Sequence, residues 1–267
     1  MNLDYIITEP PKVFGLFHIA CILIVIAICV ILGVKYKNPT EKGLNRTLLI
    51  FGLIMLVLEI YKELTYILYF DADTGTYKYS WYAFPFQFCS TPMYILLIAP
   101  FVKNKKVKDC MLSFLACFSV FGGLCVLIYP EQVFISRLGI TIQSMLHHSC
   151  QIIVGSFLIS SGVVKLNKET LLHGSYVFFV LIIMALTMNI VVYNFDLLPG
   201  HTFNMFYVGP YYECTLPLVS LLWPNEFTLL KYILFLMIYI IGFVLASGVV
   251  LIFAYLIKKC IYKIMKH

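Results

Sequence analysis

The feature that most constrains this chain is a series of apolar runs, each close to the length that crosses a bilayer. An α-helix rises 1.5 Å per residue, so about 20 apolar residues span a hydrocarbon core of about 30 Å. Hydrophobic residues make up 61% of the sequence and charged residues 12%, which is far from the composition of an average soluble domain. We therefore predict an all-α polytopic membrane protein, a single domain over residues 1–267 built as a bundle of seven transmembrane helices. The predicted spans are Val13–Val34, Thr47–Phe70, Phe84–Val102, Cys110–Tyr129, Leu138–Gly162, Leu171–Tyr193 and Leu230–Ile257.

Basic residues predict the orientation of these spans, because Lys and Arg in short loops stay on the cytoplasmic side. Most of the 19 basic residues fall in every second connection: Lys35–Arg46, Lys103–Lys108, Lys165–Lys168 and Lys258–Lys266. We expect the N-terminus outside, the C-terminus in the cytoplasm and the chain in the cell membrane. The same distribution accounts for the net charge of +6 without a nucleic-acid partner, since the basic residues form no stripe interleaved with aromatic residues.

One connection is much longer than the others. Residues 194–228 contain several Pro and Gly residues and two apolar stretches, FNMFYVG and LPLVSLLW. Loops of this length in compact proteins are more often functional than idle, so we interpret the segment as an outer lid that folds back over the bundle. An interfacial belt of aromatic residues that anchors the helix ends explains the same composition equally well.

The second span carries charge on one helical face. The stretch LEIYKELTY places Glu59, Lys62, Glu63 and Tyr66 at spacings of three and four residues. Each charge near the bilayer centre costs about 2.5–3.5 kcal/mol, so this face should turn toward the interior of the bundle. An internal salt bridge needs only one carboxylate for the lysine, and the second carboxylate favours a functional role.

Polar residues of the fifth span fall on two neighbouring faces. Gln143, His147 and Gln151 share one face, and Ser144 and His148 lie about 100° around the helix. Either histidine alone could equally be a packing residue that bonds a backbone carbonyl. Several spans nevertheless place polar residues at a similar depth in the outer half of the membrane, which predicts an outward-facing polar chamber. Its predicted residues are His18, Glu59, Lys62, Glu63, Gln87, Gln143, Ser144, His147, Gln151, Asn189 and Asn204.

Three short motifs resemble a known family. The third span opens FPFQFCSTPMY and resembles the YwaF-like bacterial integral membrane proteins, whose members begin this helix with a leucine-proline stretch ending in cysteine; Pro85 and Cys89 occupy these positions. The resemblance continues at Gln143, Ser144 and His148 in QSMLHHS, and at Asn204 before LLWP. Most of the chain is covered. One departure is Gln87, where members often carry a histidine.

The bacterial family is similar to the eukaryotic transmembrane protein 164 group, which is described as a lipid acyltransferase with a membrane-embedded cysteine and a histidine. The resemblance implies a cysteine-dependent phospholipid acyltransferase or lipid hydrolase that acts on membrane lipids. It implies that Cys89 accepts the acyl group, that His148 is its base, and that Gln87 or Asn204 polarises the acyl carbonyl.

Two other functions compete with this one. A small-molecule transporter or receptor-like protein could bind a polar ligand at Glu59, Lys62, Glu63 and His147 without catalysis. The sequence shows no inverted repeat, and we expect no strongly broken helix, so a secondary transporter is disfavoured. A zinc site is disfavoured because the ligand types occur without ligand spacing, and we expect no metal or other cofactor.

Overall fold

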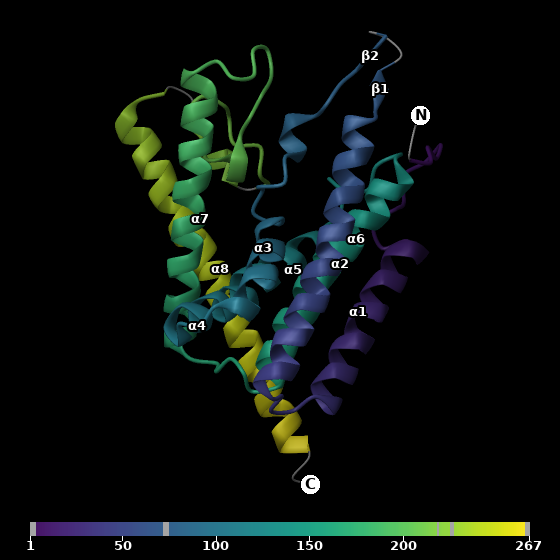
Figure 1. Ribbon diagram of the computed structural model, residues 1–267, viewed down its shortest axis with the longest axis vertical. Coiled ribbons are helices and arrows are strands. Elements are labelled where there is room, and N and C mark those ends of the chain that lie inside the picture. The colour runs from purple at the N-terminus through teal and green to yellow at the C-terminus, as the bar shows by residue number, and fades with distance from the viewer. Residues whose placement is uncertain (1–3, 72–74, 218, 225–226, 265–267) are drawn as a thin grey trace.

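The computed structural model describes residues 4–71, 75–217, 219–224 and 227–264 as one helical bundle (Figure 1). The prediction of an all-α fold is confirmed. A π-helical turn at Leu115–Ser119 joins α4 and α5 into one rod, so the described residues form seven helical units. The helices are α1 (Leu16–Lys35), α2 (Glu41–Ile67), α3 (Thr91–Ile98), α4 (Lys105–Phe114), α5 (Val120–Ile128), α6 (Leu138–Ser160), α7 (Lys168–Asn194) and α8 (Leu229–Ile264).

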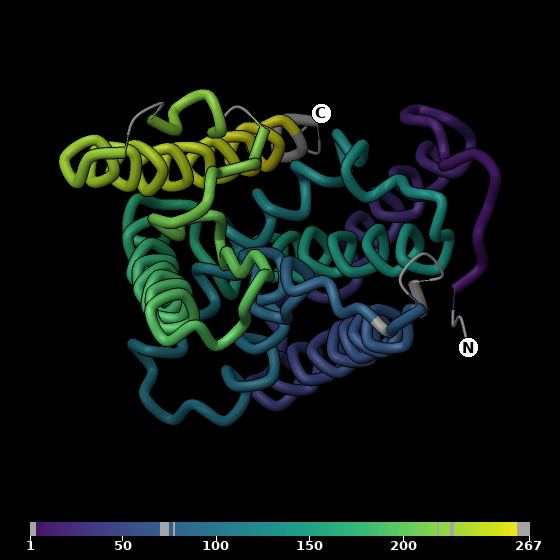
Figure 2. Tube along the Cα trace, turned by 90° about the horizontal axis from the view of Figure 1, so that it is seen from above, coloured from purple at the N-terminus to yellow at the C-terminus, as the bar shows by residue number. Residues whose placement is uncertain are grey.

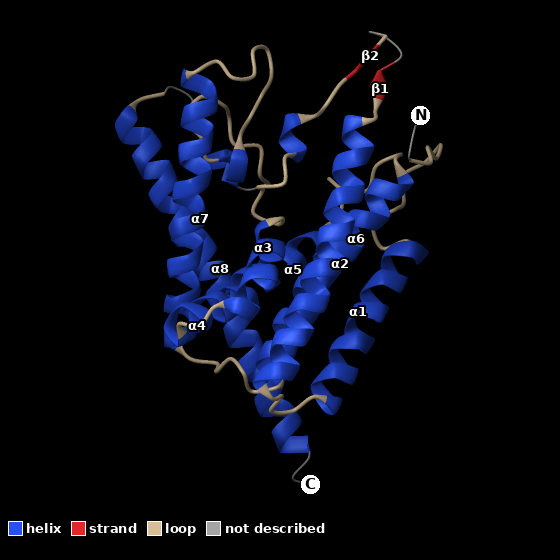
Figure 3. Cartoon of the chain, viewed as in Figure 1, coloured by secondary structure: helices blue, strands red, loops and turns tan. Residues whose placement is uncertain are grey.

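The connections between the helices contain only short elements. Strands β1 (Phe70–Asp71) and β2 (Thr76–Tyr77) form a hairpin of two residues a side after α2. The 3₁₀ turns are η1 (Trp81–Ala83), η2 (Ala99–Phe101), η4 (Met205–Tyr207) and η5 (Val219–Leu222). Figure 3 shows that the longest loops gather at the end of the bundle that carries the N-terminus. The linkers 36–40, 102–104 and 161–167, with the C-terminus, lie at the opposite end (Figure 1). Lys266 of the C-terminal basic cluster lies outside the described residues.

Five helical units are long and apolar enough to cross a membrane: α1, α2, the α4–α5 rod, α7 and α8. Helices α1, α2, α7 and α8 carry many exposed large hydrophobic side chains on their outer faces, as lipid-facing helices do, whereas the α4–α5 rod is largely buried within the bundle. Two of the predicted spans are not in this set. The helix at α3 and η2 covers only residues 91–101. Helix α6 is 23 residues long, but it carries the polar residues of the fifth predicted span and is largely buried against α1, α2 and α5.

The third predicted span differs from its prediction as a continuous helix over Phe84–Val102, because helix α3 begins only at Thr91. Phe84 precedes a proline and is extended, at φ −46° and ψ 135°, since the ring of Pro85 disfavours helical geometry in the residue before it. Pro92 lies in the first turn of α3, where a missing N–H breaks no helical hydrogen bond. Residues 84–90, here called the Cys89 segment, are therefore not helical. The expectation that no span is strongly broken is wrong.

The long connection after α7 also enters the bundle. The buried residues of this connection include Phe203, Asn204, Met205, Phe206 and Val208, whereas η5 is largely exposed. We call residues 203–209 the re-entrant turn. Viewed along the bundle, its light green trace lies near the centre, beside the green helix α7 and the blue Cys89 segment (Figure 2). Irregular backbone is tolerated at membrane depth only where protein groups satisfy its N–H and C=O groups, so both segments need partners.

The N-terminal segment fixes the start of α6. The Asp4 carboxylate accepts hydrogen bonds from the amides of Gly139 at 2.5 Å and Ile140 at 3.3 Å, so it caps this helix from a distance of 135 residues in sequence. Arg137 lies 3.5 Å from Asp4 and stacks over the ring of Tyr66 in α2, 4.7 Å from its centroid. The segment therefore ties α6 to α2 at the end of the bundle where the functional site lies.

Candidate functional site

Two amide side chains hold the re-entrant turn. The Oε1 atom of Gln87 accepts a hydrogen bond from the Phe206 amide at 2.9 Å, and its Nε2 donates to the Asn204 carbonyl at 3.2 Å. Asn189 of α7 accepts from the Met205 amide at 2.7 Å and donates to the Met205 carbonyl at 2.9 Å. The side-chain amides of Gln87 and Asn189 thus pair backbone N–H and C=O groups of the buried turn, as a neighbouring strand does in a sheet.

Other side chains complete this network. The Tyr239 hydroxyl of α8 donates to the Phe206 carbonyl at 2.9 Å, and the Tyr232 hydroxyl donates to the Val208 carbonyl at 2.5 Å. Asn204 accepts from the Gly209 amide at 2.8 Å and donates to the Glu213 carbonyl at 3.4 Å. Gln87 also donates to the Tyr82 carbonyl at 3.2 Å. The amides of Gln87 and Asn204 are therefore already engaged with backbone and are not free to polarise an acyl carbonyl.

The re-entrant turn is strained. Phe206 and Tyr207 have φ values of 57° and 56°, in the left-handed region that bulky residues rarely adopt. Each such residue costs on the order of 1–3 kcal/mol, and such strain persists only where the surroundings hold it. The hydrogen bonds from Gln87, Asn189 and Tyr239 supply that support. Strain of this kind is found disproportionately at functional sites.

A buried charged cluster lies on α2. The Lys62 ammonium is 2.7 Å from Glu59 Oε1 and 3.3 Å from Glu63 Oε1. Glu59, which is 3% exposed, also accepts from the Ser90 hydroxyl at 3.0 Å and lies 3.7 Å from Nε2 of His147. The cluster therefore joins α2, α6 and the Cys89 segment.

The second carboxylate of the cluster has its own partner in the loop after α2. The Tyr79 hydroxyl donates to Glu63 Oε2 at 2.5 Å. Burial and the Glu63 carboxylate raise the pKa of Tyr79, so its hydroxyl stays protonated and continues to donate. Tyr79 thus bonds Oε2 of Glu63, while the buried Oε1 has the Lys62 ammonium 3.3 Å away but accepts no hydrogen bond from the described residues.

The two histidines of α6 have different partners. His147 Nδ1 lies 3.4 Å from Nε2 of Gln151, an amide donor, so the ring proton of His147 belongs on Nε2, facing Glu59. His148 Nδ1 lies 2.7 Å from the Ser144 carbonyl and must donate to it. This tautomer leaves a lone pair on Nε2 of His148, as a general base requires. The two ring centroids are 5.9 Å apart. The Ser144 hydroxyl donates to Gln143 Oε1 at 3.3 Å.

Cys89 lies between these groups and the re-entrant turn. Its carbonyl accepts from Gln151 at 2.8 Å, which fixes the Cys89 segment to α6. Its thiol is within electrostatic reach of Lys62, Glu59 and the Ser90 hydroxyl, and the residue is half-buried. Cys89 also precedes the first turn of α3, and a helix N-terminus favours a thiolate. In the described part of the chain, no hydrogen bond joins Cys89 to His148, so that pairing stays a prediction.

The structure thus brings together most of the residues expected in the polar chamber, but not His18. The His18 ring lies 2.7 Å from the Leu127 carbonyl through Nε2 and accepts from the Phe14 amide through Nδ1 at 2.9 Å. It links the start of α1 to the end of α5 and is bonded to no residue of the charged cluster. Three neighbours of the site were not predicted: Ser90, Tyr79 and Tyr207.

The sequence indicates these three residues to different degrees. Ser90 follows Cys89 directly and could have been considered with it. Tyr79 lies in a loop where no pattern marks it. Tyr207 belongs to FNMFYVG, which reads as an apolar stretch. Among the described residues, no group of three or more His, Cys, Asp or Glu side chains is arranged to hold a metal ion.

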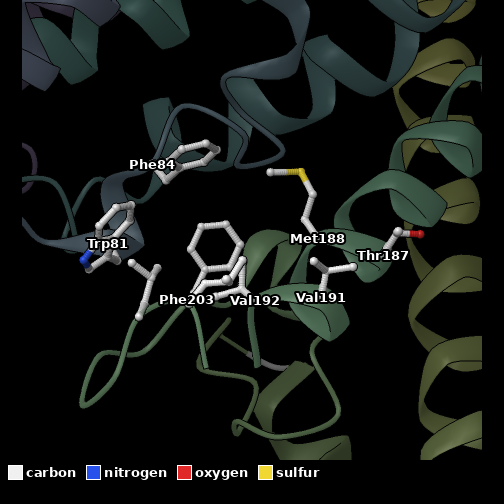
Figure 4. A pocket seen from close by; sticks show the side chains of 9 residues that line it. Trp81, Phe84, Thr187, Met188, Val191, Val192 and Phe203 are labelled. Atoms are coloured by element: carbon white, nitrogen blue, oxygen red, sulfur yellow. The ribbon is translucent and has the colours of Figure 1, made fainter. Parts of the chain in front are cut away.

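An apolar pocket of about 370 Å³ lies beside the same segments (Figure 4). Trp81 and Phe84 line one side of it, and Phe203 of the re-entrant turn packs against Phe84 with ring centroids 5.3 Å apart. Thr187 and Val191 on the exposed face of α7 form another part of the wall. The remaining lining residues are Met188, Val192, Leu197 and Leu198. The pocket therefore connects the lipid-facing surface of α7 to the two non-helical segments.

Comparison with known proteins gives one finding. The family model described as the TMEM164 family matches residues 13–257, which include every helix from α1 to most of α8, the Cys89 segment and the re-entrant turn. Neither the curated proteins nor the solved structures contain a match.

Proposed function

The chain belongs to the TMEM164 family, and from that premise we propose that it is a cysteine-dependent acyltransferase acting on membrane phospholipids, with Cys89 as the acyl carrier. The observation that carries the proposal is the placement of Cys89. The thiol is half-buried on a non-helical segment directly before a helix, and the nearby Lys62 ammonium offsets part of the cost that burial places on a thiolate. Structural cysteines in apolar surroundings lack these features.

The proposed chemistry is a double displacement. The Cys89 sulfur attacks the ester carbonyl of a phospholipid, so a C–S bond forms and the ester C–O bond breaks. The thiol proton passes to His148 and then to the departing glycerol oxygen, which leaves as a lysophospholipid hydroxyl. The hydroxyl of a second lysophospholipid then attacks the thioester carbonyl and gives its proton to His148; an ester C–O bond forms, the C–S bond breaks, and His148 returns the proton to the departing sulfur. Splitting acyl transfer in this way replaces one difficult step by two easier ones.

His148 is the proposed base because its tautomer suits the role. The bond from Nδ1 to the Ser144 carbonyl leaves Nε2 able to accept a proton. His147 is less suited, since its Nδ1 accepts from Gln151 and its Nε2 faces the Glu59 carboxylate. The proposal requires Nε2 of His148 to reach the thiol, directly or through one water, once lipid is bound; catalytic hydrogen bonds often tighten only in the substrate complex.

The apolar pocket supports a lipid substrate. Its volume of about 370 Å³ lies within the range of small-molecule sites, and its wall is almost entirely hydrocarbon and aromatic. Phe84 in its wall is five residues from Cys89, a separation of at most about 18 Å. An acyl chain spans half of the hydrocarbon core, about 15 Å, which is comparable to that upper limit. We assign the pocket to the acyl chain of the donor lipid.

We further propose that the site opens toward the outside of the cell membrane. The basic linkers lie together at the opposite end of the bundle, as expected for a cytoplasmic face. Residues 194–228 would then contain an outer lid over a polar chamber, with the re-entrant turn as the part that reaches inward.

Acyl labelling tests the proposal. Full-length protein in detergent would be incubated with a phosphatidylcholine whose acyl chain ends in an alkyne, and protein-bound alkyne would be measured before and after neutral hydroxylamine, which cleaves thioesters. We expect hydroxylamine-sensitive labelling that Cys89→Ala abolishes and that Cys21→Ala, on the outer helix α1, retains. Labelling that persists in Cys89→Ala would overturn the proposal.

A second candidate is ligand binding without catalysis. The broken third span and the re-entrant turn meet beside a charged cluster, and discontinuous segments of this kind form the binding sites of many transporters. Glycerophosphocholine, a zwitterion with a phosphate for Lys62 and a cation for Glu63, is a suitable probe. A rise in melting temperature with this compound that Glu63→Gln removes and Cys89→Ala keeps, together with the absence of acyl labelling, would favour this function.

A further inference from the structure

We infer that Tyr207 donates the hydrogen bond that stabilises the oxyanion formed when the Cys89 thiol attacks a lipid ester. This inference rests on the proposed acyl transfer and names a catalytic residue within it. Acyl transfer develops negative charge on the carbonyl oxygen, and a preorganised donor at that position is often the largest single contribution to catalysis. The two amides that the sequence suggests for this role, those of Gln87 and Asn204, are engaged with backbone. The site therefore needs another donor.

The geometry brings Tyr207 to the thiol. Gln87 lies two residues before Cys89, and its carbonyl oxygen is bonded to the amide of Phe206, the residue before Tyr207. The same side chain bonds the Asn204 carbonyl, so both ends of the turn are fixed against the Cys89 segment. Tyr207 lies within electrostatic reach of Cys89, and both residues are half-buried.

Among the described residues, the hydroxyl of Tyr207 has no hydrogen-bond partner, unlike those of the neighbouring tyrosines. The neighbouring hydroxyls of Tyr232 and Tyr239 donate to the carbonyls of the re-entrant turn, and that of Tyr82 is bonded to Tyr66. In the part of the chain that the structure describes, the Tyr207 hydroxyl makes no such bond. A second donor is close by: the amide of Cys89 donates to no carbonyl of the described residues and lies against its own sulfur. A phenol and a backbone amide together form a two-donor oxyanion hole.

Backbone strain gives independent support. Phe206 and Tyr207 hold consecutive left-handed conformations, which bulky residues rarely adopt. Asn189 and Tyr239 hold the turn in this shape through bonds to Met205 and Phe206. The strain fixes the direction in which the Tyr207 side chain leaves the backbone, as expected for a group that must be placed accurately.

The test compares two reactions of the same thiol in full-length protein. Acylation by the alkyne-tagged phosphatidylcholine passes through an oxyanion, whereas alkylation by iodoacetamide does not. We expect Tyr207→Phe to slow single-turnover acylation of Cys89 by about 100- to 1000-fold, as for the loss of one oxyanion donor, with iodoacetamide alkylation of Cys89 unchanged. Tyr211→Phe, in the same loop but stacked on Tyr193, is the matched control and should change neither rate.

Each other outcome contradicts the inference. Equal acylation rates in Tyr207→Phe and the unsubstituted protein would show that the hydroxyl has no role. Equal losses in acylation and alkylation would show that Tyr207 acts on the thiol or on the fold instead of the oxyanion. Either result leaves the acyl-carrier role of Cys89 standing, whereas absence of any acylation in the unsubstituted protein would overturn both proposals.

Discussion

The amide clamp on the re-entrant turn gives the most quantitative prediction. Asn189→Leu keeps the size of the side chain but removes both hydrogen bonds to Met205, a residue with no exposed surface. A buried backbone group left without a partner costs about 1–3 kcal/mol, so the N–H and the C=O together cost about 2–6 kcal/mol. Because each 1.4 kcal/mol is a factor of ten in an equilibrium constant, local opening of the turn should become at least about 25-fold more frequent.

Amide hydrogen exchange of a peptide covering residues 203–209 measures this opening directly. The matched control is Asn194→Leu on the same helix, where the side chain is exposed and bonds Ile190 and Tyr211. A surface change of this kind is usually within about 0.5 kcal/mol, so exchange at the turn should change by no more than about 2.5-fold. The reasoning is refuted if Asn189→Leu leaves exchange of the turn unchanged, or if both variants accelerate it equally.

Three further predictions concern the groups around Cys89. His148→Gln should slow Cys89 acylation by at least about 100-fold in the labelling assay, whereas His173→Gln on α7 should not; equal rates in both would remove His148 as the base. Lys62→Met should lower the free energy of unfolding by about 3 kcal/mol, measured by thermal denaturation, because Glu59 is then buried without its cation; unaltered stability would contradict the ion-pair argument. His18→Leu should destabilise the bundle by about 2 kcal/mol and leave the acylation rate intact, since its ring bonds the backbone of Phe14 and Leu127 and packs against Phe134; a lost rate with unaltered stability would place His18 in the site.

Much of the bundle could be predicted from apolar length and helical period. The period of 3.6 residues places Glu59, Lys62 and Glu63 together, and the cost of lipid-exposed charge predicts that they face inward. The same period predicts that His147 and His148 diverge, and their rings take different partners. These inferences hold because helix geometry is local and depends little on the rest of the fold.

The broken third span could not be predicted by the same method. Hydropathy does not distinguish a helix from a buried non-helical segment, and the stretch FPFQFC is as apolar as the helices around it. The signal that was available lies in Pro85, near the start of the non-helical residues, and in Pro92, in the first turn of α3. The partners of the re-entrant turn could not be predicted from local sequence either. The hydrogen bonds from Gln87 and Asn189 to this turn join residues 16 to 119 positions apart. Polar residues predicted to line a chamber are thus in part the partners of buried backbone.

The most direct measurement is the mass of the protein after incubation with a phospholipid acyl donor, followed by fragmentation to locate any added group. The acyl-carrier account predicts an increase by one acyl chain, lost on treatment with neutral hydroxylamine and located on the peptide that contains Cys89. An unmodified Cys89 in protein that turns over lipid, or an acyl group located on another residue, would contradict it.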